Sequence, residues 1–345
     1  MGITDSVGMF GLAERFPEQV EEAFHRSSTV SGLPAREEIE NVVVVGMGGS
    51  GMAGDVLATV AAPLLAVPVV LVKGYECPHF IGESSLVFAV SASGRTEETI
   101  QAASDAALAG ARMVVVTAGG ELAELAKIWR APLVRVPPDI PQPRAALGAM
   151  AVPLLVVLWR MGLLAAADQW VEQAVRQLKR RRDELAGGGA GSPAAEVARR
   201  IGTTVPVVHG GGYIGSAAAK RWRTQVNENA KRLAFSSEQP ELCHNEICGW
   251  ADSAKDIGAL LSLVMLRHDS EHPQVGRRFD ITASLVGPLV SDVVEVRAQG
   301  DGDLAQLLDL VYFGDYVSLW LAAQAGVDPG PVEVLTWLKR QLAGG

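Results

Sequence analysis

The strongest constraint on the fold is the alternation of short apolar runs with helix-like segments in the first half of the chain. Five runs of this kind lie at 42–45, 68–72, 86–90, 112–117 and 132–136. Short apolar strands separated by helices are typical of a parallel sheet that helices cover on both faces. We therefore predict an α/β fold built on a flavodoxin-like parallel sheet.

A glycine-rich stretch at 187–193, Gly-Gly-Gly-Ala-Gly-Ser-Pro, interrupts this periodicity and predicts a linker. Beyond it the same order of elements restarts, so we expect the second half to be a divergent repeat of the first. We predict an N-terminal domain at 1–163, a connecting helix and linker at 164–193, and a C-terminal domain at 194–345.

The elements of the second domain are predicted from the same patterns. Strands are expected at 205–209, 257–265 and 292–296, a glycine turn at 210–213, and helices at 214–231, 304–325 and 331–342. Pro331 suits the first turn of the last helix, where its missing N–H costs nothing.

Composition narrows the class of protein. The formal net charge of −9 argues against a protein that coats nucleic acid, since that binding needs Lys and Arg to neutralise phosphates. The three cysteines, at 77, 243 and 248, form no disulfide framework and suit a reducing cytoplasm. The N-terminus lacks the apolar region of a signal peptide. We expect a cytoplasmic protein without a nucleic-acid partner.

The apolar stretch between Arg144 and Arg160 is shorter than the roughly 18–20 residues that cross a bilayer. It also contains Gly148 and Pro153. We therefore predict a buried helix over about 145–163 and no membrane partner.

Two loops rich in glycine and serine directly follow predicted strands. Residues 46–51 are Gly-Met-Gly-Gly-Ser-Gly, and residues 91–96 are Ser-Ala-Ser-Gly-Arg-Thr. Loops after neighbouring parallel strands lie side by side at the carboxyl edge of the sheet, where such sheets bind ligands. The hydroxyl groups of Ser91, Ser93 and Thr96 stand at the start of a helix, whose first amides favour an anion. Each loop alone fits an ordinary capped turn, but together they predict a phosphate pocket.

The glycine spacing leaves a second interpretation open. Gly46, Gly48 and Gly51 match G-x-G-x-x-G, the pattern of a dinucleotide-binding loop. Such a site expects an acidic residue at the end of the second strand, to bind a ribose hydroxyl. The chain has Lys73 there, with Glu76 only beyond it, so a dinucleotide-dependent oxidoreductase is the less favoured alternative.

Further motifs point to a known family. Residues 142–144 are Gln-Pro-Arg, and the block 225–250 contains Asn-Glu-Asn followed by His-Asn-Glu. With these motifs and the two loops, nearly the whole chain resembles the archaeal and bacterial bifunctional phosphoglucose/phosphomannose isomerases. The resemblance implies two sugar-isomerase domains. It also implies an aldose–ketose isomerase that interconverts glucose 6-phosphate and mannose 6-phosphate with fructose 6-phosphate, without a metal or other cofactor.

The resemblance also implies which residues bind the substrate. Four hydroxyl side chains would hold the 6-phosphate, those of Ser50, Ser91, Ser93 and Thr96. Two glycines would let the backbone approach the sugar, Gly48 and Gly49.

Catalytic roles are implied in the same way. Glu228 resembles the general base that moves a proton between C2 and C1 through a cis-enediol, and Arg144 would stabilise the enediolate oxygen. His244 and Lys339 resemble the pair that opens the sugar ring. In this family the histidine comes from the other subunit, so we expect a homodimer with His244 contributed across the interface.

The periodicity of the last helix bears on Lys339. Leu335, Leu338 and Leu342 form an apolar stripe, and 100° per residue places Lys339 near its middle. We therefore predict that the stripe and the lysine face inward. By the same geometry Glu228 lies away from the apolar side of its own helix and is expected in solvent.

His244 lies beside Cys243 and four residues before Cys248, but this spacing matches no common zinc pattern, so no metal site is predicted. Ala92 and Arg95, and the residues 145–147, differ from the family pattern and are expected to reshape the pocket.

A non-catalytic sugar-phosphate sensor remains an alternative, although such a sensor has no use for Glu228.

Overall fold

The structure is a computed structural model that describes residues 4–252 and 254–343, and its chain forms two compact units. The N-terminal unit comprises Arg15–Arg180 and Gln299–Asp309. The C-terminal unit comprises the chain up to Glu14, Arg181–Ala298 and Leu310–Gly345. These limits differ from 1–163 and 194–345, and the predicted domain boundaries stay predictions.

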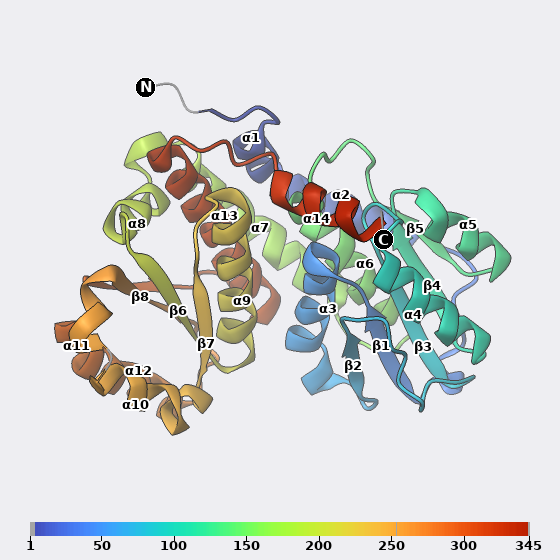
Figure 1. The fold of residues 1–345 in the computed structure, drawn as a ribbon. Coiled ribbons are helices and arrows are strands. Elements are labelled where there is room, and N and C mark those ends of the chain that lie inside the picture. Colours follow the sequence, from blue (N-terminus) through green and yellow to red (C-terminus); the bar gives the residue numbers. More distant parts are fainter. Residues whose placement is uncertain (1–3, 253, 344–345) are drawn as a thin grey trace. The chain divides into compact units, whose positions relative to one another are not determined.

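The N-terminal unit is a five-stranded parallel sheet with the order β2-β1-β3-β4-β5 (Figure 1). This is the flavodoxin-like order, with the carboxyl ends of all strands at one edge. The strands are β1 (Asn41–Val45), β2 (Val69–Val72), β3 (Ser85–Val90), β4 (Arg112–Thr117) and β5 (Leu133–Arg135). The helices are α2 (Phe16–Ser28), α3 (Gly48–Val60), α4 (Glu97–Leu108), α5 (Gly120–Ile128), α6 (Leu147–Arg160) and most of α7 (Ala167–Leu185). All five predicted strands are confirmed.

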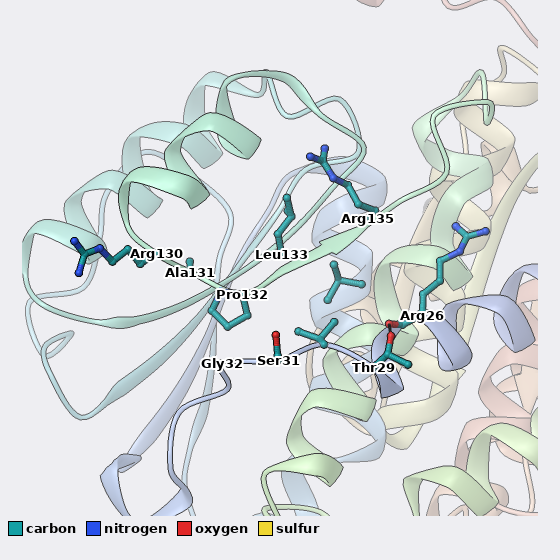
Figure 2. Close-up of a pocket in the computed structure, with 11 residues that line it drawn as sticks. Arg26, Thr29, Ser31, Gly32, Arg130, Ala131, Pro132, Leu133 and Arg135 are labelled. Carbon is teal, nitrogen blue, oxygen red and sulfur yellow. Dashed lines mark hydrogen bonds between the residues drawn. The ribbon is translucent and has the colours of Figure 1, made fainter.

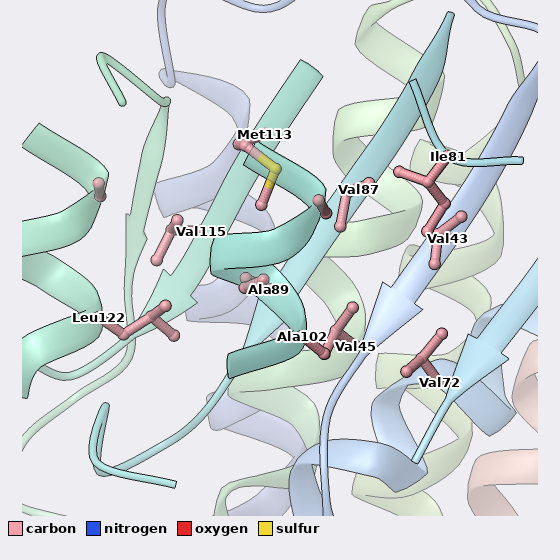
Figure 3. Close-up of a cluster of buried hydrophobic side chains, with 13 residues drawn as sticks. Val43, Val45, Val72, Ile81, Val87, Ala89, Ala102, Met113, Val115 and Leu122 are labelled. Atoms are coloured by element: carbon pink, nitrogen blue, oxygen red, sulfur yellow. The ribbon is translucent and has the colours of Figure 1, made fainter. Parts of the chain in front are cut away.

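Alternation along the strands explains why both faces of this sheet are covered. Val43 and Val45 of β1 point into one apolar cluster with Ala102 of α4 and Leu122 of α5 (Figure 3). Side chains of a strand alternate between faces, so Val44 lies on the opposite face, where α3 and α6 pack against the sheet. Both faces are therefore buried, as the near-continuous valine runs require.

Helix α6 is the buried helix that the sequence predicts. The segment Pro143–Arg160 is apolar and long enough to cross a membrane, but 78% of it is buried inside the protein. It packs against α2 and α3 within the N-terminal unit. Its apolar character is explained by this packing.

The C-terminal unit contains a four-stranded parallel sheet with the order β7-β6-β8-β9. Its strands are β6 (Val205–Gly211), β7 (Phe235–Gln239), β8 (Leu261–Arg267) and β9 (Asp292–Arg297). Its helices are α1 (Met9–Glu14), α8 (Pro193–Ile201), α9 (Gly212–Asn229), α10 (Glu246–Asp252), α11 (Ala254–Ile257), α12 (Pro273–Val286), most of α13 (Asp303–Ala325) and α14 (Glu333–Ala343). Helix α9 covers one face, and α12 packs on the other with Phe279 in the core.

Several details of the second half differ from the sequence prediction. Strand β6 continues through Gly210 and Gly211, so the predicted turn at 210–213 reduces to the junction with α9, where Gly212 has a φ of +56°. Strand β8 starts at Leu261, four residues after its predicted start. The glycine stretch at 187–193 ends in an ordered turn, because the hydroxyl of Ser192 accepts a hydrogen bond from the backbone N of Ala195 and caps α8.

Candidate functional site

The two glycine- and serine-rich loops meet at the carboxyl edge of the N-terminal sheet. Strands β1 and β3 are direct neighbours there. The backbone N of Ala92 donates a hydrogen bond to Oγ of Ser50 at 3.2 Å, and that hydroxyl also contacts Sδ of Met150 at 3.2 Å. Ser50 therefore joins the first loop to the second.

The second loop is folded by its own hydroxyl groups. Oγ of Ser91 lies 2.9 Å from Oγ1 of Thr96 and accepts a hydrogen bond from the backbone N of Gly94. Oγ of Ser93 accepts one from the backbone N of Arg95. Gly94 has a φ of +63°, and a Cβ there would overlap the backbone of Gly119. The loop thus joins the hydroxyl groups of Ser91 and Thr96 at the start of α4 and leaves Ser93 exposed.

Helices α3 and α4 begin at these loops without a side-chain cap. The residue before α3 is Met47, which offers no oxygen in its side chain, and Thr96 before α4 bonds Ser91 instead of the helix amides. The first amides of a helix need partners, and an anion satisfies them. Two helix N-termini and a set of hydroxyl groups therefore converge on one edge, which is an arrangement that can bind phosphate.

Arg144 lies against the first loop. It belongs to the short helix η3 (Pro143–Ala146), is 2% exposed, and donates from Nη1 to Oε1 of Gln142 at 2.9 Å. A Cβ on Gly49 would lie 3.1 Å from the carbonyl oxygen of Pro143 and 3.2 Å from Cα of Arg144. Glycine at 49 thus permits the close approach of the Pro143–Arg144 backbone to the first loop.

The N-terminal unit therefore gathers seven predicted site residues. They are Gly48, Gly49, Ser50, Ser91, Ser93, Thr96 and Arg144. The remaining three, Glu228, His244 and Lys339, belong to the C-terminal unit.

Lys73 is a further cation at this edge. It directly follows β2, forms an ion pair with Asp55 of α3, and its Cε lies 3.3 Å from the position of a Cβ on Gly51. In the sequence, Lys73 is distinguished only by its position directly after β2, the strand that neighbours the strand of the first loop.

Glu228 lies in the last turn of α9. Its side chain is half-buried, whereas its neighbour Asn229 is buried and donates from Nδ2 to Oγ of Ser318 at 2.8 Å. Periodicity predicts Glu228 in solvent, whereas the structure has it partly buried in the last turn of α9. Lys231, with a φ of +54°, donates to the carbonyl oxygen of Glu228 at 2.7 Å.

His244 is exposed at the end of the short helix η5 (Glu241–His244), which follows β7. Within the part of the chain that the structure describes, its imidazole makes no recorded hydrogen bond. The neighbouring side chains are anchored, since Sγ of Cys243 lies 3.0 Å from Oε1 of Gln239 and Leu242 is buried.

The prediction that the last helix faces inward is wrong for this structure. Leu335, Leu338 and Leu342 of α14 are 43%, 47% and 69% exposed, and Lys339 is exposed with them. Periodicity identifies the apolar side of a helix but not what covers it.

Glu246 belongs to the His-Asn-Glu motif, but the sequence pattern indicates no role for it. Its Oε1 lies 2.9 Å from Nε2 of His209 and accepts from Nε1 of Trp250 at 2.9 Å, and its Oε2 accepts from the hydroxyl of Ser237. Burial raises the pKa of Glu246, but the hydrogen bonds from His209, Ser237 and Trp250 outweigh it and lower the pKa to about 2. This carboxylate therefore stays ionised under ordinary conditions.

A hollow of about 550 Å³ lies elsewhere in the N-terminal unit, between the end of α2 and the edge strand β5. Figure 2 shows that the guanidinium groups of Arg26, Arg130 and Arg135 around it point in separate directions. It contains none of the predicted site residues. Among the described residues there is also no group of three or more His, Cys, Asp or Glu side chains that could hold a metal ion.

Comparison with known proteins places the chain among sugar-phosphate enzymes. Residues 37–132 match the family model of the SIS domain, and residues 190–342 match that of the bacterial phospho-glucose isomerase C-terminal SIS domain. The chain is 34% identical over 337 residues to the bifunctional phosphoglucose/phosphomannose isomerase of Caldicellulosiruptor bescii, covering 97% of this chain and 99% of that protein. The protein of the same name from Aquifex aeolicus is 32% identical, with 88% and 90% covered.

The fold is shared more widely. The crystal structure of a hypothetical protein from Thermus thermophilus superposes with a TM-score of 0.71 at 15% identity, covering 98% of this chain and 91% of that one. At this identity the similarity concerns the fold alone.

Proposed function

This chain belongs to the family of bifunctional phosphoglucose/phosphomannose isomerases, and we propose that it interconverts glucose 6-phosphate and mannose 6-phosphate with fructose 6-phosphate. The observation that carries the proposal is the joined pair of loops at the N-terminal sheet edge, with Arg144 beside them. A dinucleotide site would not need the hydroxyl groups of the second loop.

The loops supply the binding step. Ser50, Ser91, Ser93 and Thr96 hold the 6-phosphate together with the uncapped starts of α3 and α4. Gly48 and Gly49 leave room for the sugar next to the backbone. Because the phosphate is at the far end of the sugar from C1 and C2, this grip orients the reacting carbons without taking part in the reaction.

Proton transfer belongs to Glu228. The carboxylate removes the proton from C2 of the open-chain aldose and returns it to C1, through a cis-enediol. Glucose 6-phosphate and mannose 6-phosphate differ only in configuration at C2, so both give the same enediol when that proton leaves. One base therefore serves both substrates, and Arg144 stabilises the negative oxygen that develops.

His244 and Lys339 open the ring before the proton transfer. We propose that His244 reaches the site from a second copy of the chain. Strand β7 starts near the end of α9 and ends just before η5, and the backbone N of Ala234 donates to Oδ1 of Asn227 at that first end. Glu228 and His244 thus lie toward opposite ends of β7, whose five residues span about 17 Å. This separation supports a homodimer in which each site takes the two residues from different copies.

The experiment is an isomerase assay on fructose 6-phosphate in the presence of a metal chelator, with glucose 6-phosphate and mannose 6-phosphate measured separately. We expect both products, because the steps above rely on Glu228. Fructose without phosphate is the control and should be turned over poorly. Absence of both products, or activity only with an added dinucleotide, would refute the proposal.

The three free thiols, of Cys77, Cys243 and Cys248, fit a cytoplasmic enzyme.

A further inference from the structure

We propose that Glu246 is a positioning residue that fixes the His244 segment for ring opening, by tying α10 to strands β6 and β7. This inference rests on the proposed function. Glu246 follows His244 by two residues, and its carboxylate contacts His209 of β6 and Ser237 of β7. The segment that carries His244 is thus held to two neighbouring strands by one side chain.

The environment of this carboxylate suits an anchor. His209 is fully buried, and its Nε2 is the atom that meets Glu246. Trp250 is also buried and donates its indole N–H to the same oxygen. A carboxylate with only 30% of its side chain exposed, and bonded by three donors, has little freedom. These bonds leave Glu246 in one place relative to the sheet.

His244 itself has the opposite character. It is exposed, and between it and the anchor stands Asn245, whose Oδ1 accepts from the backbone N of Glu246 and whose Nδ2 donates to Oε1 of Glu241. A group that opens the sugar ring must meet its oxygen within hydrogen-bond reach. An exposed residue on a short turn gains that precision only from fixed neighbours, and Glu246 supplies the nearest fixed point on its C-terminal side.

The test compares two substrates in Glu246→Gln. Fructose 6-phosphate closes its ring through the hydroxyl at C5. The open analogue, 5-deoxyfructose 6-phosphate, lacks that hydroxyl and needs no ring opening. We expect kcat for fructose 6-phosphate to fall by at least about tenfold, with KM and the rate on the open analogue within about twofold of wild type. His244→Asn should give the same selective loss.

Glu241→Gln is the matched control, because this exposed carboxylate lies on the same segment and bonds only Asn245 in the described structure. It should leave both rates unchanged. An equal loss on both substrates in Glu246→Gln would overturn the proposal in favour of a purely structural role, and so would no loss on either.

Amide hydrogen exchange separates this inference from the proposed function. In Glu246→Gln the backbone N–H of Asn245 and Cys248 should exchange about tenfold faster than in wild type and in Glu241→Gln. If the wild-type protein isomerises neither substrate, the proposed function fails. The exchange measurement tests the anchoring role separately, and unchanged exchange in Glu246→Gln would overturn it. Faster exchange confined to 242–250 would support it.

Discussion

The hydroxyl of Ser50 lies 3.2 Å from the backbone N of Ala92, and this hydrogen bond links the loop after β1 to the loop after β3. The two loops are more than forty residues apart in the sequence. They meet because β1 and β3 pair directly, with Val45 opposite Ala89. Ser50 therefore links the two loops, and in the proposed function its hydroxyl also binds the phosphate.

Ser50→Ala should weaken phosphate binding more than it destabilises the fold. Loss of one hydrogen bond to a charged group weakens binding by about 2 kcal/mol. Because about 1.4 kcal/mol corresponds to a tenfold change in affinity, we expect KM for fructose 6-phosphate to rise at least tenfold. Steady-state kinetics and a thermal melt measure the two effects. Ser284→Ala on α12, where an exposed hydroxyl bonds only Asp280, is the matched control and should change neither. An unchanged KM in Ser50→Ala would remove Ser50 from the phosphate site.

Gly49→Ala should displace the Arg144 segment. The new methyl group would lie 3.1–3.3 Å from backbone atoms of Pro143 and Arg144, which must move by a few tenths of an ångström. We expect kcat/KM to fall about tenfold with little loss of thermal stability. Gly11→Ala, where no atom lies within 4 Å of the added carbon, should leave activity intact. Equal activity of the two variants would show that this close approach has no role in catalysis.

Strands buried on both faces could be predicted from the sequence, because their apolar runs have no other explanation. The run at 112–117 coincides with β4. Strand β7 could not, since Phe-Ser-Ser-Glu-Gln is an edge strand with only Gln239 buried, and its pattern resembles a loop. The exposure of the apolar side of α14 could not be predicted either, because an apolar stripe does not identify the surface that covers it.

The candidate site divides in the same way. The meeting of the two loops at one sheet edge could be predicted, because glycine and hydroxyl side chains directly follow two strands in the local sequence. Lys73 and Glu246 could not, because their partners come from other elements: Asp55 lies eighteen residues before Lys73, and His209 lies thirty-seven before Glu246. Only the fold brings such pairs together.

Stability should depend on the charge of Glu246. Its folded pKa of about 2 lies below the ordinary value of 4.5, so ionised Glu246 stabilises the folded state above about pH 5, and this contribution is lost as pH falls toward about 2. A shift of this size corresponds to about 3 kcal/mol, so we expect Glu246→Gln to be less stable than wild type by up to that amount near neutral pH, with the difference narrowing in acid. Urea unfolding at several pH values measures it. A difference that stays constant with pH would contradict the assignment, and Glu241→Gln should show little difference throughout.

Glu228→Gln should abolish turnover while leaving substrate binding intact. Removing a general base typically lowers the rate by about 10²–10⁴-fold, and the amide keeps the size of the side chain. Exchange of the C2 proton of glucose 6-phosphate with solvent deuterium should be lost in parallel. Glu238→Gln, an exposed carboxylate on β7, is the control. An active Glu228→Gln enzyme would show that another residue is the general base. It would favour a role in substrate binding alone for this half of the chain.

Mixing two impaired variants tests the shared site. In a hybrid dimer of Glu228→Gln and His244→Asn, one site receives both altered residues and the other receives both native ones, provided that each site takes Glu228 and His244 from different copies. Random pairing makes half of the dimers hybrids, and each hybrid has one intact site of two, so about a quarter of wild-type activity should return. Unfolding and refolding the two variants together, with each refolded alone as control, measures this. No recovery in the mixture would place both residues of a site on one chain, and the roughly 17 Å along β7 would then have to be bridged by a movement within the C-terminal unit.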